Sequence, residues 1–283
     1  MSYIPLSTEK INNIAEEFFL NKINKNHIQR QEKPILTLIA AQPGAGKTKI
    51  ADHIKQELKQ KGGYIHVDAD RMREEIPNYA KYPSHVTQAD AGKLVNTLRN
   101  LAKEARVNII EEGTFRDSKS LSAFLEKNKQ LGYHVEMVAL AVPREQSLLG
   151  IYSRFEKQKE AGVNARFVPP DYHDNAFNGF RETVKSLENK FDSFRVFNRE
   201  GQLLYDAKNK GENLTASDVL EKNLISTAEE KIFVLKQMQI LKEKAQVREG
   251  NTPYIEEFER VIQKEREKRK TTYSFRKKYK SLI

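Results

Sequence analysis

The sequence contains no cysteine and no long apolar run. Without cysteine, disulfide bonds, thiolate metal sites and a cysteine nucleophile are excluded, which is consistent with a reducing compartment. The first residues, Met1 to Lys10, lack the apolar core of a signal peptide. No apolar stretch approaches the roughly 18 residues that cross a membrane. We therefore expect a cytoplasmic protein that has no membrane-spanning segment.

Acidic residues are fewer than basic ones, but the excess of positive charge is local. The formal net charge is +10, and residues 264–283 alone contain nine Lys or Arg against two Glu. The rest of the chain therefore carries a net charge of only about +3. A basic terminal run is usually a solvated tail, so this charge says little about the chemistry of the folded body.

Short apolar runs alternate with segments of helical spacing. Four of these runs predict strands, at residues 35–41, 64–67, 107–110 and 133–142. Segments with helical spacing lie at residues 11–19, 50–58, 87–106 and 121–131. The alternation predicts an α/β fold of three layers, with a mostly parallel central sheet. In such folds, ligands gather at the carboxyl ends of the strands.

The chain length favours one catalytic domain with extensions. Residues 194–198 and 203–205 flank a turn and predict a hairpin at the end of this domain. Residues 217–246 and 253–270 predict charged amphipathic helices, the second opened by Thr252 and Pro253. We therefore divide the chain into an N-terminal helical segment (1–33), a P-loop kinase domain (34–206) and a helical C-terminal extension with a basic tail (207–283).

Residues 41–48 match the phosphate-binding loop G-x-x-x-x-G-K-[ST] except at the first position, which is Ala41. The expected nucleotide-binding residues are Gln42, Pro43, Gly44, Ala45, Gly46, Lys47 and Thr48. The glycines let backbone N–H groups point at phosphate oxygens, Lys47 reaches the β/γ-phosphates, and the Thr48 hydroxyl ligates Mg²⁺. A GTPase, an ATPase and a kinase all satisfy this motif. The N-K-x-D tetrapeptide at residues 189–192 falls at the end of a predicted helix, so we do not assign it to guanine binding.

Acidic residues follow the second predicted strand. Asp68 and Asp70 stand at its carboxyl end, where a carboxylate would face the phosphates. A kinase needs an acid group to accept the proton of the acceptor hydroxyl. If the chain turns helical after Val67, the two side chains diverge, and one Asp caps the helix while the other faces the reacting centre. We expect Asp70 to be the catalytic one.

Two further groups of polar residues could complete such a site. Residues 111–116 follow the third predicted strand and place acids, a hydroxyl and a cation at the same edge. Arg154 and Arg166 flank residues 155–165, whose polar, glycine-containing composition is typical of a mobile lid. Such arginines can neutralise the charge of a transferred phosphoryl group. Taken singly, each is also explained as a solvated surface charge.

Several of these blocks together resemble the zeta toxin family. The blocks are Gln42 to Thr48, Asp68 to Asp70, Glu112 to Thr114 with Arg116, Ala141 to Pro143, Leu149 and Gly150 with Arg154, and Asn198 to Gly201 with Leu204 and Tyr205. Their order and approximate spacing match those of the family. Members of the family resemble small-molecule kinases and phosphorylate the sugar of UDP-N-acetylglucosamine at its 3'-hydroxyl.

The resemblance implies roles for individual residues. It implies that Asp70 is the general base and that Lys47, Arg154 and Arg166 stabilise the phosphates, with ATP and Mg²⁺ bound. The substrate-binding residues are then Asp68, Arg73, Asn96, Glu112, Thr114 and Arg116. It also implies a small helical antitoxin that obstructs the ATP site.

The chain departs from the family pattern at two places. Ala40 and Ala41 stand where the family usually has glycine, which is tolerable if position 41 has a negative φ. Asn96 stands where an acidic residue is expected, which bears on the identity of the acceptor.

Two other functions remain open from the sequence. One is a kinase of another small hydroxyl compound, such as a nucleoside or an antibiotic, on the same scaffold. The other is a nucleic-acid-binding module, in which basic and aromatic residues of the tail bind phosphates and stacked bases. Those tail residues are Tyr273, Phe275, Arg276, Lys277, Lys278 and Tyr279. Because the charge is confined to a terminus, we do not expect nucleic acid to be the partner.

Overall fold

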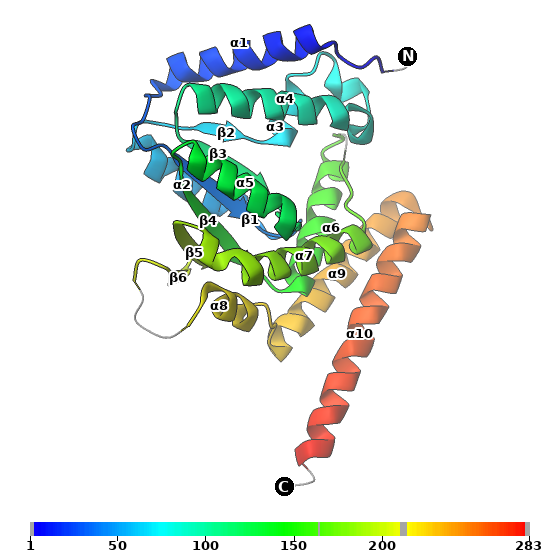
Figure 1. Ribbon diagram of the computed structural model, residues 1–283. Helices are drawn as coiled ribbons and strands as arrows, with labels where there is room; N and C mark the ends of the chain where they lie inside the picture. Colours follow the sequence, from blue (N-terminus) through cyan, green and yellow to red (C-terminus); the bar gives the residue numbers. More distant parts are fainter. Residues whose placement is uncertain (1–2, 164, 210–213, 281–283) are drawn as a thin grey trace.

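The computed structural model describes residues 3–163, 165–209 and 214–280. The described strands form one sheet in the order β2-β3-β1-β4-β5-β6 (Figure 1). The strands are β1 (Ile35–Ala40), β2 (Ile65–Val67), β3 (Ile109–Gly113), β4 (His134–Ala141), β5 (Ser193–Asn198) and β6 (Leu203–Asp206). β1 to β5 are parallel, and β6 pairs with β5 in the antiparallel sense. The predicted mostly parallel sheet and its terminal hairpin are confirmed.

Helices cover both faces of this sheet (Figure 1). They are α1 (Thr8–Asn26), α2 (Thr48–Lys59), α3 (Ala69–Glu74), α4 (Ser84–Glu104), α5 (Ser118–Gln130), α6 (Arg144–Glu160), α7 (Pro170–Leu187), α8 (Ala216–Asn223), α9 (Ala228–Glu249) and α10 (Pro253–Lys280). Within the ranges given above, no helix has the length and apolarity needed to cross a bilayer.

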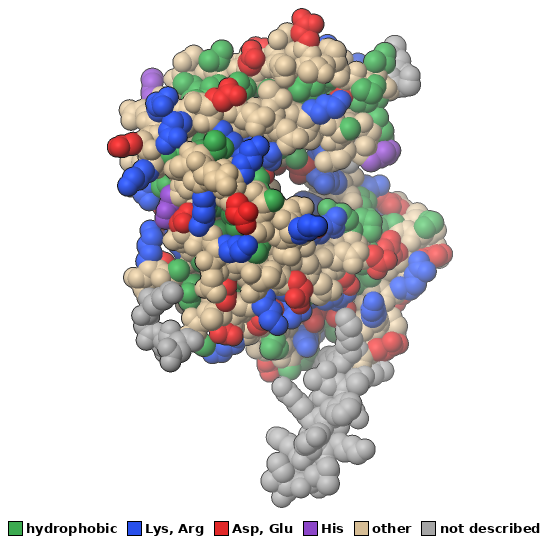
Figure 2. Space-filling model, viewed as in Figure 1, with side chains coloured by type: hydrophobic (Ala, Val, Ile, Leu, Met, Phe, Trp, Pro, Cys, Tyr) green, Lys and Arg blue, Asp and Glu red, His purple; other side chains and the backbone are tan. Residues whose placement is uncertain are grey.

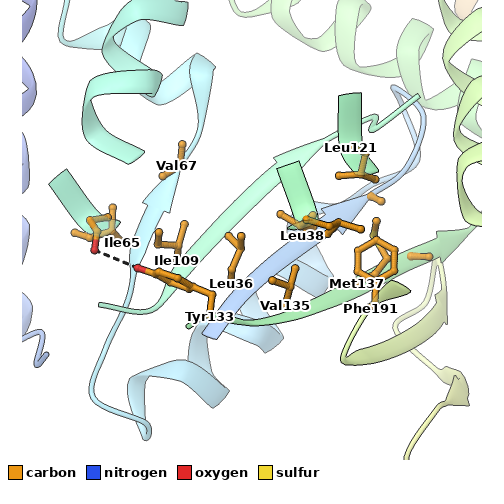
Figure 3. Packing of buried hydrophobic residues seen from close by; sticks show 14 of the residues in the cluster. Leu36, Leu38, Ile65, Val67, Ile109, Leu121, Tyr133, Val135, Met137 and Phe191 are labelled. Carbon is orange, nitrogen blue, oxygen red and sulfur yellow. Dashed lines mark hydrogen bonds between the residues drawn. The ribbon is translucent and has the colours of Figure 1, made fainter. Parts of the chain in front are cut away.

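Alternation along the strands divides the core between the two faces. In β1, Leu36 and Leu38 belong to a large cluster that also includes residues of α1, α4, α5 and α7. Ile39, one residue further on, belongs to a second cluster, which it shares with Ile50 and Ile54 of α2. Figure 3 shows the first cluster, with Leu36, Leu38 and other labelled strand residues packed against one another. Because successive side chains of a strand point to opposite faces, the sheet packs against helices on both sides and forms the middle layer of three.

The third strand begins later than the sequence predicts and ends later too. It covers Ile109–Gly113 rather than residues 107–110. At its start lies Asn108, whose buried side chain joins β3 to β1 and to the turn before β2. Its amide nitrogen donates to the carbonyls of Lys61 (2.8 Å) and Gly63 (2.9 Å), and its oxygen accepts from the Ile35 N–H (2.8 Å). Residues 111–113 pair with β1 and therefore belong to the strand itself.

The C-terminal extension contains a break that the sequence pattern did not predict. The helix expected over residues 217–246 is two helices, α8 and α9. Thr227 starts α9 with a capping box, because its hydroxyl accepts from the Glu230 N–H (3.2 Å) and the Glu230 carboxylate accepts from the Thr227 N–H (2.7 Å). The Thr-x-x-Glu spacing was visible in the sequence as a helix-start signal.

The segment expected to form a lid is only partly a loop. α6 continues to Glu160, so the first half of residues 155–165 is helical. Phe155 and Glu156 are buried, because α9 and α10 pack against this part of α6. Glu156 accepts hydrogen bonds from Tyr254 (2.7 Å) and Arg248 (2.8 Å). The C-terminal extension therefore supports the helix that carries Arg154.

The N-terminal segment is attached to α4 through one buried carboxylate. Asp90 is 1% exposed, and its Oδ2 accepts from the Tyr3 hydroxyl (2.6 Å) and the Leu6 N–H (2.7 Å). Lys93 lies 3.0 Å from the other oxygen. Burial acts to raise the pKa of Asp90, but these hydrogen bonds outweigh it and hold the pKa below its ordinary value.

This carboxylate makes stability depend on pH. A group whose pKa is depressed in the folded state stabilises it above the unfolded pKa of about 3.9, and that stabilisation is lost as the pH falls through the folded value. We expect Asp90→Asn to lower the free energy of unfolding at pH 7 by about 2 kcal/mol. In urea titrations, the difference from the wild type should shrink below about pH 4. Asp52→Asn, which removes an exposed carboxylate, is the matched control. If the difference in unfolding free energy between Asp90→Asn and the wild type stays constant down to pH 3, the ionised Asp90 carboxylate is not the source of the stabilisation.

Candidate functional site

The predicted phosphate-binding loop joins β1 to α2 in the required strand-loop-helix context. Gly44 and Gly46 have φ values of +79° and +85°, which favour glycine. A Cβ at Gly44 would lie 2.0 Å from the Ser147 carbonyl oxygen, so this position also requires close approach to α6. Ala41 is fully buried and is not among the described residues of positive φ. Alanine in place of the family's usual glycine at position 41 is therefore sterically acceptable, as expected.

The helix end and the lysine of the loop are arranged to receive an anion. α2 starts without a side-chain hydrogen bond at its cap, so its first N–H groups keep no side-chain partner. The Lys47 ammonium donates to the Ala41 carbonyl (3.3 Å). Burial, together with the charge of Arg154, lowers the pKa of Lys47, while Glu112, Asp68 and Asp70 oppose the shift. The predicted carboxylates thus surround this ammonium.

A buried polar network holds the loop in place. The Gln42 amide nitrogen donates to the Val142 carbonyl (2.7 Å) and to the Ser147 hydroxyl (3.1 Å). From Ser147 the network continues to the ring of His173 (2.8 Å), which in turn contacts Asp174 (3.0 Å). Arg144 then joins Asp174 (2.8 Å) to Glu265 of α10 (2.5 Å). The Gln42 side chain thus anchors the loop to Val142 and to α6, and its role as a nucleotide-binding residue, which a phosphate loop performs through its backbone, stays a prediction.

The order Ser147, His173, Asp174 in this network is that of a nucleophilic triad. Ser147 and His173 are both 0% exposed, so a substrate has no access to the hydroxyl. Burial acts to raise the pKa of Asp174, but His173 and Arg144 outweigh it and hold the pKa far below its ordinary value. The arrangement is therefore a buried polar network that links α6, α7 and α10.

Asp68 and Asp70 take different positions, as the sequence predicts. Asp68 caps α3, and its side chain accepts from the Asp70 N–H (3.0 Å). The Asp70 carboxylate accepts from Arg73 (2.6 Å) and from Arg166 (2.5 Å). Burial acts to raise the pKa of Asp70, but Arg166 and then Arg73 outweigh it, and the net shift is downward. Asp70 is accordingly ionised at neutral pH and held by two cations.

The two adjacent glutamates of β3 point to opposite sides of the sheet. Glu112 lies 3.0 Å from the His66 ring nitrogen. Burial acts to raise the pKa of Glu112, but His66 and Lys47 outweigh it and lower the pKa. Glu111 instead accepts two hydrogen bonds from Arg99 of α4 (2.8 and 2.7 Å). Only Glu112 therefore belongs to the group around Lys47.

Three predicted substrate residues lie outside this immediate group. Asn96 is exposed on α4 and accepts from Arg99 (2.6 Å), which places it on the side of Glu111. Thr114 is half-buried just after β3. Arg116 lies over the Tyr172 ring of α7, 4.7 Å from its centre. Between Thr114 and Arg116, Phe115 has a φ of +43°, a left-handed conformation that is strained for an aromatic residue.

Arg199 was not among the predicted site residues. It follows β5, donates to the Gln146 carbonyl (2.8 Å), and lines a cavity of about 420 Å³. Arg154 and Gly150 line the same cavity, and an added Cβ at Gly46 would lie 3.8 Å from Arg199. The rule that ligands gather at carboxyl ends of strands would have found Arg199, had it been applied to the fifth strand.

The donor groups near Lys47 are compatible with magnesium. The Thr48 hydroxyl is exposed at the start of α2, and Asp68 has one carboxylate oxygen that no described residue contacts. No cluster of three or more metal-ligating side chains occurs in the described part of the chain. Mg²⁺ needs none, because it usually takes one or two protein oxygens and completes its shell with phosphates and water. The oxygen donors present therefore fit a nucleotide-borne Mg²⁺.

The space-filling view shows a hollow between α4 and α6, with Lys and Arg side chains at its margin (Figure 2). It lies on the side of the sheet edge where β1, β2 and β3 end. Around this edge the fold brings together the phosphate loop, an ionised aspartate and several arginines. Fold and site together define a P-loop protein of the kinase-like class.

Comparison with known sequences specifies the family. The sequence profile of the zeta toxin family matches residues 20–210. Toxin PezT of Streptococcus pneumoniae serotype 4 is 34% identical over 206 residues, which cover 68% of this chain and 79% of that protein. Toxin zeta of Streptococcus pyogenes is 28% identical over 229 residues, covering 75% and 78%. The chain belongs to the zeta toxin family, so the resemblance noted in the sequence is confirmed.

Solved structures share the fold. A chain from the PezAT chromosomal toxin-antitoxin system of Streptococcus pneumoniae superposes with a TM-score of 0.73 at 24% identity, covering 86% of this chain and 99% of that chain. A chain from the structure of AvrRxo1-ORF1:-ORF2 with ATP gives a TM-score of 0.55 at 15% identity, covering 81% and 78%. At these identities the superpositions establish the fold alone.

The buried network predicts an effect on nucleotide binding at a residue that cannot touch the nucleotide. Ser147→Ala removes the hydroxyl between Gln42 and His173, so we expect ATP to bind about three- to tenfold more weakly, the equivalent of one hydrogen bond. Calorimetric titration with ATP measures this change. Ser186→Ala, whose exposed hydroxyl bonds only within α7, is the control. Loss of thermal stability at unchanged ATP affinity would show that the network supports the fold without placing the loop.

Proposed function

We propose that this chain is an ATP-dependent kinase whose acceptor is a sugar hydroxyl of a UDP-activated sugar. Residues 34–206 form the catalytic domain in this proposal, supported by the flanking helices. The observation that carries it is the grouping of Lys47, Asp70, Arg154 and Arg166. Lys47 interacts electrostatically with Asp70 and Arg154, and Arg166 bonds to Asp70 directly. A phosphate anchor, an ionised acid and nearby arginines are the parts that phosphoryl transfer requires.

In the proposed reaction, the acceptor oxygen attacks the γ-phosphorus of ATP. The bond from the γ-phosphorus to the β,γ-bridging oxygen breaks, ADP leaves, and Asp70 takes the proton of the acceptor hydroxyl. The depressed pKa keeps the carboxylate ionised before transfer, and the carboxylate becomes a stronger base when a neighbouring cation moves away. Lys47 and Arg154 would neutralise the charge on the phosphates. Thr48 and Asp68 would hold Mg²⁺, which would supply positive charge to neutralise the phosphates.

Arg166 has to change partners during such a cycle. It pairs with Oδ1 of Asp70, the oxygen that Arg73 also contacts, and the two cations weaken this carboxylate as a base. The γ-phosphate offers the guanidinium a bidentate anion in exchange. Movement of Arg166 from carboxylate to phosphate would free Asp70 for the acceptor at the moment the donor is in place.

The family and its relatives support a particular acceptor and a partner. Membership of the zeta toxin family favours the 3'-hydroxyl of UDP-N-acetylglucosamine, and its phosphorylation would block cell-wall precursor synthesis, making the protein a toxin. The structural neighbour PezAT is a toxin-antitoxin system, which supports a small helical antitoxin as partner. Glu112, Thr114 and Arg116 are the proposed contacts to the sugar nucleotide, with Arg73 and Asn96 further out.

Substitutions at two positions separate chemistry from binding. We expect Asp70→Ala to reduce phosphoryl transfer at least a hundredfold while ATP affinity changes less than threefold, because the removed group acts on the acceptor. Lys47→Ala should weaken both ATP binding and turnover, since the ammonium faces the phosphates in both states. Single-turnover rates and ATP titrations give these numbers. If Asp70→Ala turns over near the wild-type rate, Asp70 is not the general base.

The acceptor is identified by product analysis. Purified protein, Mg²⁺ and γ-labelled ATP are incubated with a panel of UDP-sugars, nucleosides and aminoglycoside-type antibiotics. We expect label in UDP-N-acetylglucosamine, and loss of that label in Asp70→Ala. Label in a nucleoside or an antibiotic alone would favour the second candidate, a kinase of another small hydroxyl compound. A panel in which every UDP-sugar stays unlabelled contradicts the proposed acceptor.

The nucleic-acid alternative depends on residues whose side chains lie outside the described part of the structure. Tyr273, Phe275, Arg276, Lys277, Lys278 and Tyr279 belong to that set. The backbone of α10 continues past them to Lys280, well away from the P-loop (Figure 1). No observation on the described residues favours this alternative.

A further inference from the structure

A second cavity lies away from the P-loop, between α1, α2 and the edge strand β2. Its volume of about 470 Å³ is within the range of small-molecule sites. Its cationic lining residues are Lys22, Lys25, Lys55, Lys59 and Arg71. Among the described residues, no Asp or Glu lines it. Figure 2 shows Lys and Arg side chains gathered on this side of the molecule, over the end of α1 and over α2.

These cations have few counter-charges. Of the five, only Lys55 has a described carboxylate at salt-bridge distance, the exposed Asp52 at 3.0 Å. Lys22 and Arg71 both lie over the Phe18 ring, 5.1 and 5.5 Å from its centre. Burial lowers the pKa of Lys22, and the neighbouring charges of Arg71 and Lys25 lower it further, against a smaller effect of Glu75. Like charges close together on a concave surface repel one another and produce a positive potential, which a bound anion would lower.

We propose that this cavity binds a small molecule carrying two or more phosphate groups. Several ammonium groups and one guanidinium around a space of this size suit a ligand with several negative charges close together. A singly charged ion would leave most of the repulsion in place. The half-buried Tyr64 adds an aromatic surface at the wall. This inference does not depend on the proposed kinase activity.

The cavity is also connected to the candidate active site. His66 lines it, and its ring nitrogen lies 3.0 Å from Glu112. Glu112 in turn acts on the charge of Lys47. An occupant of the cavity would therefore be linked to the phosphate anchor through two side chains, His66 and Glu112.

The test must separate this cavity from the P-loop, which also attracts phosphates. We would titrate inorganic tripolyphosphate into the full chain carrying Lys47→Ala, at low ionic strength, by calorimetry. We expect one remaining binding site. Adding Lys22→Gln and Lys59→Gln should weaken it at least tenfold. Adding Lys236→Gln and Lys244→Gln, exposed residues of α9, changes the net charge equally and should weaken it less than twofold.

A parallel titration with ADP identifies the source of the phosphates. Tighter binding of ADP than of tripolyphosphate supports a nucleotide as the ligand, and the reverse supports a phosphate chain without a base. Absence of any tripolyphosphate site in the Lys47→Ala protein would overturn the proposal, as would equal losses in the two lysine pairs. Binding of a single-stranded RNA oligonucleotide that depends on Lys22 and Lys59, without tripolyphosphate binding, would also overturn it.

Discussion

The buried network that begins at Gln42 is the constraint on which the rest of the site depends. A phosphate loop acts through backbone N–H groups, so its conformation must be held before the ligand arrives. Here the loop is pressed against α6 at Gly44, and Gln42 is bonded to Ser147 of the same helix. From there the contacts continue through α7 to Glu265 of α10. Helices distant in sequence thus determine the shape of eight residues near the N-terminus.

Most of the fold could be predicted from the sequence because its signals are local. Alternating apolar runs and helical segments indicated the parallel sheet, and the strand-loop-helix context placed the phosphate loop correctly. The errors occurred where a single side chain overrides the local pattern. At the start of β3, Asn108 bonds to residues more than 40 positions away. Thr227 divides a continuous amphipathic pattern through a capping box.

Single residues of the candidate site could be selected from the sequence, but their arrangement could not. The rule that ligands gather at strand ends selected Asp70 and Glu112, and both lie near Lys47. The rule could not tell which of Glu111 and Glu112 faces the site. The side of the sheet that each residue faces depends on where β3 starts. Spacing also gave no sign of the pairs Glu112 with His66, or Arg144 with Glu265. Such pairs join residues far apart in the chain and become visible only in three dimensions.

The ion pair between Arg166 and Asp70 has a further consequence, for the fate of ATP when no acceptor is present. A kinase that binds its donor first exposes the γ-phosphate to water, and a free carboxylate nearby would activate that water as readily as a sugar hydroxyl. Arg73 and Arg166 both donate to the same carboxylate oxygen of Asp70, Oδ1. As long as these contacts persist, the two cations lower the basicity of the carboxylate, which makes it a poor base toward a stray water molecule. In the proposed reaction, the pair that opens for transfer would therefore also limit wasteful hydrolysis of the nucleotide.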